Sequence, residues 1–401
     1  MSNGPISIPD HLQNLIYKIL KEHGMSGTIS MKGRQPLKPG ANWLGQILEI
    51  EAVGGNPQNQ EKTLIFIAKM APTIKLYRDF FPIRLIYERE IYMYNTIIPE
   101  FLKVQKQLNV MNFFAPFVHC YATNFEEEQE IVLLENMFTL GYRSIGQHLP
   151  VDYQHASLIM KACGKLHALS FVIKDHKPEL FEEMRNNTKE IFMSSGLRES
   201  FLELIMKLGT KVLNYLEKDS KVYKAFETLL KHSSFFIDIP QCKADGEYAV
   251  IAHGDYEIRN MLFKYEDKVD DSSPTDLCLL DWQLSVFANP MVDVSIFIWI
   301  CTDQKLRDQH YFDLIESYYD SFSSFLLELG GDLEKSYPRT VFDKHLKQYS
   351  AFEQPNFSEA IDFTDMVKIL SENTNETYLV RIKEIVEDFI KYDYNFDGGL
   401  Q

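Results

Sequence analysis

Residues 251–265, IAHGDYEIRNMLFKY, place several polar groups between two apolar runs. Asp255 and Asn260 are five positions apart, and Asp281 follows 21 positions later, directly after the apolar run 277–280. Enzymes that transfer phosphoryl groups use this order: the first Asp takes the proton of the acceptor hydroxyl, and the Asn and the second Asp hold Mg²⁺. Oxygen ligands suit Mg²⁺ because it is a hard cation. The spacing therefore predicts Asp255 as a catalytic base and Asn260 and Asp281 as metal ligands.

Each of these residues also has an ordinary structural explanation. Taken alone, Asp255 could cap a turn, Asn260 could be a turn residue and Asp281 could begin a turn. We interpret His253 as a structural histidine. We expect the two apolar runs to form a buried hairpin, which has little reason to carry polar groups that each need a partner. The order of the three residues and the strands between them therefore favour the functional interpretation.

An independent pair of charges lies in the first third of the chain. Lys69 falls in the apolar run TLIFIAKMAP, where Ile65, Ile67 and Lys69 would share one face of a strand. Glu90 falls on the apolar stripe of a predicted helix that begins near Ile83. An ion pair between Lys69 and Glu90 explains both, and kinases use such a pair. The alternative is that Lys69 extends its ammonium group into water and that Glu90 lies at the edge of the stripe.

The elements that must position these residues follow from hydrophobic periodicity. We expect a strand-rich first part and a larger helical second part with an embedded strand pair. The predicted elements are a helix from Asp10, a loop to residue 45, strands at 46–53 and 63–72 with a turn at Gly54-Gly55, a helix from Ile83 that Pro99 ends or bends, a strand at 130–137, helices over 152–235, strands around 251–280 and helices after 290.

Composition excludes several classes of protein. The 401 residues carry a formal net charge of −16, which argues against nucleic-acid binding because that needs basic patches. The five cysteines are dispersed, so we expect reduced thiols rather than disulfides or a zinc site. We recognise no signal peptide and no membrane span. A cytoplasmic protein is the expectation, and its oligomeric state stays open.

The motifs HGDYEIRNMLF and LLDWQLSVFANPMVDVSIFIW resemble the ecdysteroid-kinase-like family of insects, a branch of the choline kinase and aminoglycoside phosphotransferase superfamily. Further landmarks appear in the family's order across nearly the whole chain: Lys69 in a strand, YEREIYMYNTIIP with Glu90, LLENM, GKLHALS, and Pro290 and Asp293 ahead of an apolar helix. The resemblance implies an α+β, bilobal, protein-kinase-like fold. Residues 1–136 would form an N-lobe of antiparallel sheet with one main helix, and residues 137–401 a mainly helical C-lobe with embedded β-hairpins.

The resemblance also implies an ATP- and Mg²⁺-dependent kinase acting on a hydroxyl of a steroid such as an ecdysteroid, or of a xenobiotic alcohol or phenol. ATP would contact Lys69, Glu90, Asn42 and the hinge near Glu135 and Met137. Asp293 would support the catalytic loop.

The chain departs from the family pattern in three places. It has Gly40-Ala41-Asn42-Trp43 where the family has a sequence close to G-E-N-Y, Glu135-Asn136 in the hinge and Tyr256 after the catalytic Asp. The phosphate loop carries no G-x-G-x-x-G. Two alternatives stay open: a catalytically inactive protein that binds nucleotide or sterol, and a choline- or aminoglycoside-type kinase. The presence of all four residues favours catalysis: Lys69, Asp255, Asn260 and Asp281.

Overall fold

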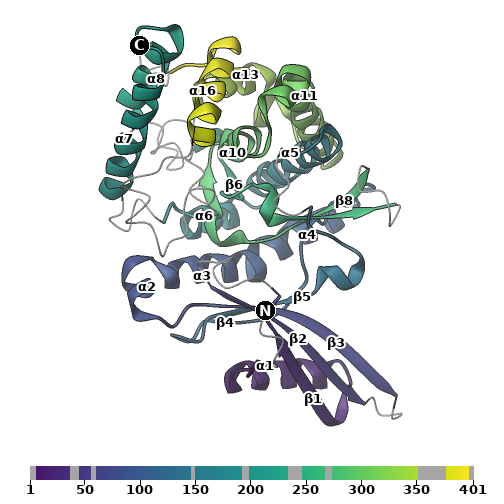
Figure 1. Cartoon of the computed structure of the whole chain (residues 1–401). Helices are drawn as coiled ribbons and strands as arrows, with labels where there is room; N and C mark the ends of the chain where they lie inside the picture. Colours follow the sequence, from purple (N-terminus) through teal and green to yellow (C-terminus); the bar gives the residue numbers. More distant parts are fainter. Residues whose placement is uncertain are drawn as a thin grey trace.

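The structure is a computed structural model that describes residues 6–36, 45–55, 60–145, 150–191, 198–233, 246–266, 273–350 and 376–396. An antiparallel sheet from the first third of the chain lies at one end, and a larger helical part lies at the other (Figure 1). The predicted α+β, kinase-like fold is confirmed. The division at residues 136 and 137 stays a prediction.

The sheet has five strands in the order β1-β2-β3-β5-β4, and every neighbouring pair is antiparallel. The strands are β1 (Ser26–Arg34), β2 (Gln46–Gly55), β3 (Glu61–Met70), β4 (Cys120–Asn124) and β5 (Ile131–Glu135). Side chains alternate between the faces of a strand. Lys69 therefore shares one face of β3 with Ile65 and Ile67, and this alternation sets its direction.

The opposite face of the sheet is covered by helix α1 (Asp10–Glu22). Leu12 and Ile16 recur at helical spacing, are fully buried, and belong to the same hydrophobic core as Phe66 and Ala68 of β3. The helix predicted from Asp10 is confirmed. Because α1 covers this face of β3, the Lys69 face is left for the functional site.

Three helices lie between the sheet and the helical part: α2 (Lys75–Phe80), α3 (Ile83–Tyr92) and α4 (Ile98–Gln107). The chain stays helical from α3 to α4 through one π-helical turn, Met93–Ile97. Pro99 does not end the helix, because it lies in the first turn of α4. A missing N–H is tolerated in a first turn.

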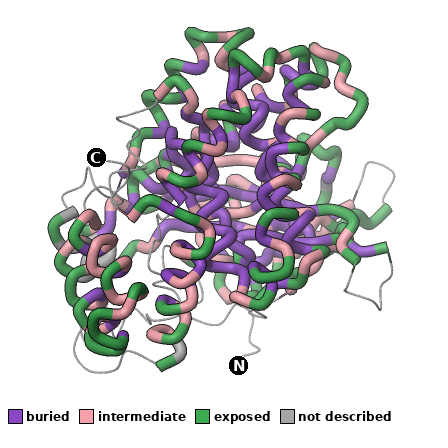
Figure 2. Tube along the Cα trace, turned by 90° about the horizontal axis from the view of Figure 1, so that it is seen from above, coloured by how far each residue is buried: buried purple, intermediate pink, exposed green. Residues whose placement is uncertain are grey.

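Buried residues gather at the centre of the molecule (Figure 2), and in the helical part many of them belong to α5 and α10. Every residue of α10 is buried, and α5 is buried along most of its length. The helices are α5 (Tyr153–His176), α6 (Pro178–Asn187), α7 (Arg198–Tyr215), α8 (Lys221–Lys231), α10 (Met291–Cys301), α11 (Gln304–Glu328), α12 (Leu333–Ser336), α13 (Arg339–Tyr349) and α16 (Glu376–Lys391). By length and composition alone, α5 is the one described helix that could cross a membrane, and its burial is typical of a core helix.

Four short strands carry the polar segments of the helical part: β6 (Val250–Ala252), β7 (Met261–Tyr265), β8 (Pro274–Leu279) and β9 (Val286–Ala288). The prediction that the two runs around residues 253–260 pair with each other is wrong. Strand β6 pairs with β9, and β7 pairs with β8. Residues 253–260, here called the polar loop, therefore connect one two-stranded sheet to the other, and the segment after Asp281 lies beside this loop.

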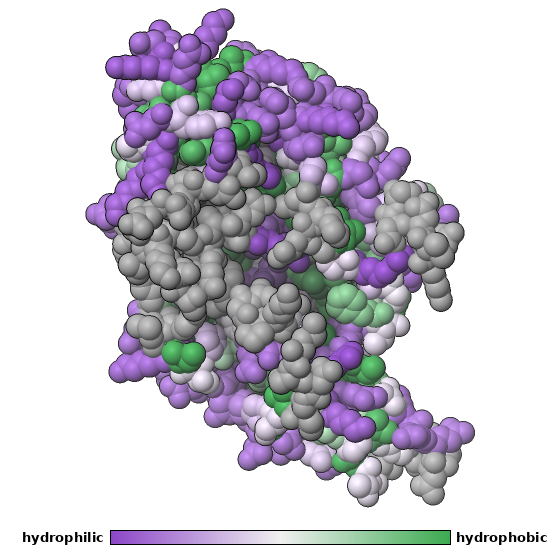
Figure 3. Space-filling model, viewed as in Figure 1, coloured by the Kyte–Doolittle hydropathy of each residue, from purple (hydrophilic) through white to green (hydrophobic). Residues whose placement is uncertain are grey.

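Two details of the first part also differ from expectation. Strand β1 lies within the segment predicted as a loop, and it is an edge strand of the sheet, paired with β2. Gly54 and Gly55 end β2 instead of forming a turn. Figure 3 shows a surface of mostly hydrophilic described residues, hollowed between the sheet and the helical part.

Candidate active site

Lys69 of β3 contacts two carboxylates that lie far apart in sequence. Its Nζ is 2.9 Å from Oε2 of Glu90 on α3 and 2.7 Å from Oδ1 of Asp281, which follows β8. The ion pair expected between Lys69 and Glu90 is therefore present. Glu90 is fully buried, whereas the Asp281 side chain is 31% exposed. The cluster thus has a buried end at Glu90 and an accessible end at Asp281.

The charges of this cluster support one another. Burial alone would lower the pKa of Lys69, but the carboxylates of Asp281 and Glu90 outweigh that effect and raise it above its ordinary value. Burial raises the pKa of Glu90, while Lys69 and a backbone hydrogen bond from Trp282 act in the opposite direction. Lys69 therefore stays cationic near neutral pH and can face an anionic ligand.

Asp255 and Asn260 stand at the two ends of the polar loop and bond to each other. The Asn260 Nδ2 donates to Asp255 Oδ2 at 2.8 Å and to the Asp255 carbonyl at 3.0 Å. Burial raises the pKa of Asp255 to about 8, and the carboxylates of Glu257 and Asp281 add to the effect. A carboxyl with a pKa near the working pH suits proton transfer.

Asn260 and Asp281 fit a hard divalent cation. Because the Asn260 amide nitrogen bonds to Asp255, its Oδ1 points elsewhere and has no hydrogen-bond partner among the described residues. Asp281 uses Oδ1 for Lys69, and its Oδ2 is likewise without a described partner. Leu280, next to Asp281, donates its N–H to the Asn260 carbonyl at 2.9 Å. One amide oxygen and one carboxylate oxygen on two neighbouring backbone segments suit Mg²⁺.

The backbone around Asp281 is unusual. Asp281 has φ of 61° and ψ of 71°, in the left-handed region that few non-glycine residues adopt. Gly254 has φ of 80°, and a Cβ there would lie 2.0 Å from the carbonyl oxygen of Leu284. Only glycine lets the Asp255 loop approach the segment after Asp281 this closely. The two segments are thus positioned as one unit.

His253 links the same two segments as a neutral ring. Its Nε2 lies 2.9 Å from the carbonyl of Leu280, which can only accept, and its Nδ1 lies 3.3 Å from the N–H of Asp255, which can only donate. These partners assign the proton to Nε2. Burial lowers the pKa of His253. The prediction of a structural histidine agrees with this bonding.

Asp293 on α10 holds the segment that leads to Asp255. Its carboxylate accepts the N–H of His253 at 2.7 Å and that of Gly254 at 2.9 Å. It also accepts from His167 Nε2 on α5 at 3.1 Å, and the other nitrogen of His167 bonds to Tyr318. Sequence reasoning quoted GKLHALS without giving His167 this role.

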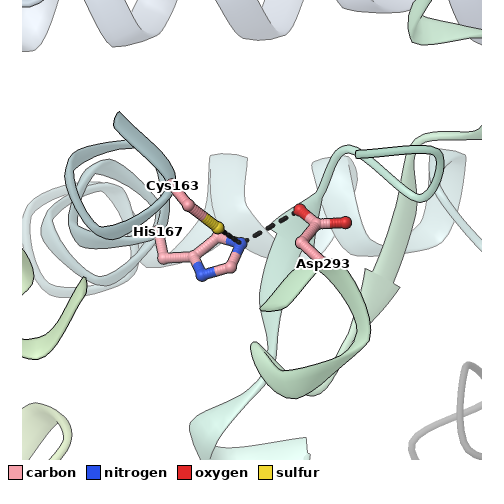
Figure 4. Close-up of side chains that lie close together, drawn as sticks. All are labelled: Cys163, His167 and Asp293. Carbon is pink, nitrogen blue, oxygen red and sulfur yellow. Dashed lines mark hydrogen bonds and ion pairs between the residues drawn. The ribbon is translucent and has the colours of Figure 1, made fainter. Parts of the chain in front are cut away.

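Cys163 joins His167 and Asp293 in a buried group with the composition of a metal site (Figure 4). Its chemistry is that of a hydrogen-bonded support instead. Burial raises the pKa of Cys163 well above its ordinary value, so that it stays a thiol. The Asp293 carboxylate already accepts three N–H groups. The hydrogen bonds account for this group without a cation.

The polar loop contains an ion pair that sequence reasoning missed. Both carboxylate oxygens of Glu257 contact Nη2 of Arg259, with Oε2 at 2.7 Å. Glu257 is buried, whereas Arg259 is exposed. The sequence does contain a signal for this pair, because Glu257 and Arg259 carry opposite charges and stand two residues apart. The pair places a carboxylate beside Asp255 together with the cation that offsets its charge.

The predicted hinge follows β5. Met137 begins a short 3₁₀ turn, so its N–H has no partner within the turn, whereas its carbonyl accepts from Tyr142. Asn136 caps that turn by accepting the N–H of Phe138 at 3.0 Å. Glu135 ends β5, opposite Phe66 of β3. Asn42 lies outside the described residues, so its predicted contact with ATP stays a prediction.

Comparison with known proteins gives one match by family. The model of the ecdysteroid kinase-like family matches residues 39–331 of the chain. No curated protein matches. The matched segment contains Lys69, Glu90, Asp255, Asn260 and Asp281, together with the His167–Asp293 support.

Proposed function

The chain belongs to the ecdysteroid kinase-like family, and from this premise we propose that it transfers the γ-phosphoryl group of ATP to a hydroxyl of a small molecule. The acceptor class that the family suggests is a steroid of the ecdysteroid type or a xenobiotic alcohol or phenol. Membership of the family shows that this is a kinase-like protein, whereas the reaction and the acceptor are part of the proposal.

The meeting of Lys69, Glu90 and Asp281 is the observation that supports the proposal most. Three charged side chains converge: one from β3, one from α3 and one that follows β8. Asn260, which is bonded to Asp255, lies on the backbone segment next to Asp281. A buried lysine needs an anionic partner. Its contact with the partly exposed Asp281 supports a position beside the phosphate oxygens of a bound nucleotide, as in a kinase.

In the proposed reaction, Asp255 takes the proton of the acceptor hydroxyl as that oxygen attacks the γ-phosphorus. The bond between the γ-phosphorus and the bridging oxygen breaks, and ADP leaves with its electron pair. Asn260 and Asp281 would hold Mg²⁺, which would neutralise charge on the phosphate oxygens. Lys69 would bind the phosphates, and the backbone near Glu135 and Met137 would contact the adenine.

A phosphorylation screen read by mass spectrometry tests the proposal. Purified protein, ATP and Mg²⁺ would be incubated with ecdysteroids, phenolic glycosides, simple phenols and choline, with Asp255→Asn as the control. We expect one acceptor to gain a single phosphate in the wild type only. A product from choline alone would favour the choline-type alternative.

The screen needs a parallel measurement of nucleotide binding. Binding of Mg²⁺·ATP without any product would favour a binding protein over an enzyme. Absence of nucleotide binding would contradict the proposal as a whole. A cytoplasmic location is part of the same proposal, to be checked by microscopy of the tagged protein.

A further inference from the structure

The turn that directly follows Asp281 determines how that carboxylate is presented. Residues 282–285, here called the 282–285 turn, include the 3₁₀ segment Trp282–Leu284. The turn is closed by Ser285, whose N–H lies 3.2 Å and whose hydroxyl lies 2.9 Å from the carbonyl of Trp282. Because Asp281 is in a left-handed conformation, a shift of this turn would reorient its side chain.

Helix α3 holds both ends of the 282–285 turn with two consecutive residues. The Glu90 carboxylate lies close enough to the backbone N–H of Trp282 for that group to lower its pKa. Arg89 donates through Nη1 to the carbonyl of Ser285. The helix that supplies the partner of Lys69 therefore also contacts the chain immediately after the proposed metal ligand.

The second arm of Arg89 reaches another part of the helical region. Its Nη2 donates to the carbonyl of Lys189, in the loop after α6. That loop is tied to β9, because the N–H of Phe287 donates to the carbonyl of Thr188 at 2.7 Å. The guanidinium thus bridges the end of the 282–285 turn and the loop after α6.

Burying the charged side chain of Arg89 costs desolvation free energy. Arg89 is 6% exposed, its hydrogen bonds go to two backbone carbonyls, and the carboxylates of Glu190 and Glu88 act on it through electrostatic attraction. Burial lowers its pKa to about 10, which leaves it cationic near neutral pH. A buried cation whose hydrogen bonds all go to backbone carbonyls contributes little net stability. A planar fork that reaches two carbonyls does, however, fix geometry, which a lysine cannot match.

We propose that Arg89 is a positioning residue for the metal site: it holds the 282–285 turn so that Asp281 presents its carboxylate to the cation. This inference rests on the proposed function, because it assumes that Asp281 binds Mg²⁺ together with a nucleotide. It assigns a role to a residue that sequence reasoning passed over. Because Arg89 lies on α3, the metal affinity of the site would depend on the position of this helix relative to the 282–285 turn.

The test uses Arg89→Gln and Arg89→Lys in the full chain, with Arg84→Gln as the matched control. Arg84 lies on the same helix, its side chain is 45% exposed, and it contacts Glu130 at 3.5 Å, away from the turn. Mn²⁺ replaces Mg²⁺ as the probe, and its binding is titrated by electron paramagnetic resonance with ADP present. ADP binding without metal is measured by calorimetry.

We expect Arg89→Gln to weaken Mn²⁺ binding about 10- to 100-fold, the usual effect of removing a group that orients a metal ligand. Arg89→Lys should fall between Arg89→Gln and the wild type, while Arg84→Gln and metal-free ADP binding stay unchanged. A purely structural role would lower thermal stability and leave Mn²⁺ affinity unchanged. If Arg89→Gln does not fold, the comparison of Arg89→Lys with Arg84→Gln decides.

Two results would overturn the inference and leave the proposed function standing. One is unchanged Mn²⁺ affinity in a folded Arg89 variant. The other is an equal loss of metal-free ADP binding, which would indicate a general disturbance of the cleft. By contrast, a wild type that binds neither ADP nor Mn²⁺·ADP would contradict the proposed function itself, and the inference with it.

Discussion

At the scale of single residues, the charges around Asp255 are set by specific partners. His253 is held neutral by one donor and one acceptor, whereas Lys69 is held cationic by two carboxylates. Asn260 is oriented by Asp255, so that its oxygen remains for another ligand. Substitutions that keep shape but change charge or proton content therefore report directly on these roles.

Asp255→Asn is expected to lower turnover about 10²- to 10⁴-fold, the usual contribution of a positioned general base. The amide has nearly the same shape but cannot take the proton of the acceptor. Nucleotide affinity should change little. The measurements are product formation by mass spectrometry and ADP binding by calorimetry. Asp276→Asn, a change on β8 at an exposed carboxylate that bonds to Tyr142, is the control, and nearly unchanged turnover in Asp255→Asn would show that the base is another group.

Lys69→Met is expected to weaken ATP binding while the fold persists. The change removes the cation beside the fully buried Glu90, and breaking a buried pair in this way destabilises by about 3–5 kcal/mol unless the carboxylate takes up a proton. The double variant Lys69→Met/Glu90→Gln should therefore regain stability without regaining ATP binding. Recovery of ATP binding in the double variant would contradict a phosphate-binding role for Lys69.

At the scale of elements, α5 and α10 support the loop that carries the proposed base, Asp255. His167 and Asp293 meet between the two helices, and Asp293 accepts both backbone N–H groups that precede Asp255. Both helices are buried along their contact. The loop is thus fixed to the core of the helical part by one carboxylate.

Asp293→Asn is expected to destabilise the protein by about 1–3 kcal/mol, because an amide nitrogen would face donors that lose their acceptor. Its hydrogen bonds hold the pKa of Asp293 below the ordinary value, although burial opposes them. Since the folded-state pKa is depressed, this stabilisation is present above the ordinary pKa and is lost as the pH falls. Urea unfolding should show the largest difference between wild type and variant at neutral pH, shrinking below about pH 4. A difference independent of pH would contradict this account.

The sequence was a good guide to local elements and a poor guide to their pairing. The strand with Lys69, the helix with Glu90 and the helix from Asp10 follow from periodicity and charge placement. The pairing of β6 with β9 could not be predicted, because each strand is three residues long and register depends on tertiary packing. Edge strand β1 was missed for another reason: its sequence, SGTISMKGR, contains two glycines and little hydrophobic alternation, and its pairing with β2 stabilises it.

Within the site, the residues that carry charge in apolar surroundings were predictable. Lys69 and Glu90 were out of place in their own elements, and that mismatch identified them. Arg89 was equally out of place beside Glu90, but its partners are backbone carbonyls, which no sequence pattern reveals. The left-handed conformation of Asp281 was likewise beyond reach, because it follows from contacts with another segment.

At the scale of the whole molecule, one hydrophobic core holds the sheet and α1, and a larger core holds the helical part. The polar site lies where strands and loops from both meet, since Lys69 comes from the sheet and Asp281 from the helical part. Anything that binds both should therefore stabilise the protein as a unit.

Mg²⁺·ADP is expected to raise the midpoint of thermal unfolding more than ADP or Mg²⁺ alone. A ligand at 100 times its Kd stabilises the folded state by about 2.7 kcal/mol. Asp281→Asn should abolish the extra effect of Mg²⁺ and keep most of the effect of ADP. Differential scanning fluorimetry measures both. An equal Mg²⁺ effect in wild type and variant would show that the cation binds elsewhere.

The ion pair between Lys69 and Asp281 joins residues 212 positions apart, and Asp293 must be in place to hold the loop at Asp255. During synthesis on the ribosome, the sheet can form early, but the site cannot close until α10 has emerged from the exit tunnel. A nascent chain that stops before residue 293 would thus carry Lys69 and Asp255 without the arrangement that joins them. The proposed kinase activity would therefore be acquired late in translation, and chains terminated before residue 293 are expected to be inert rather than partially active.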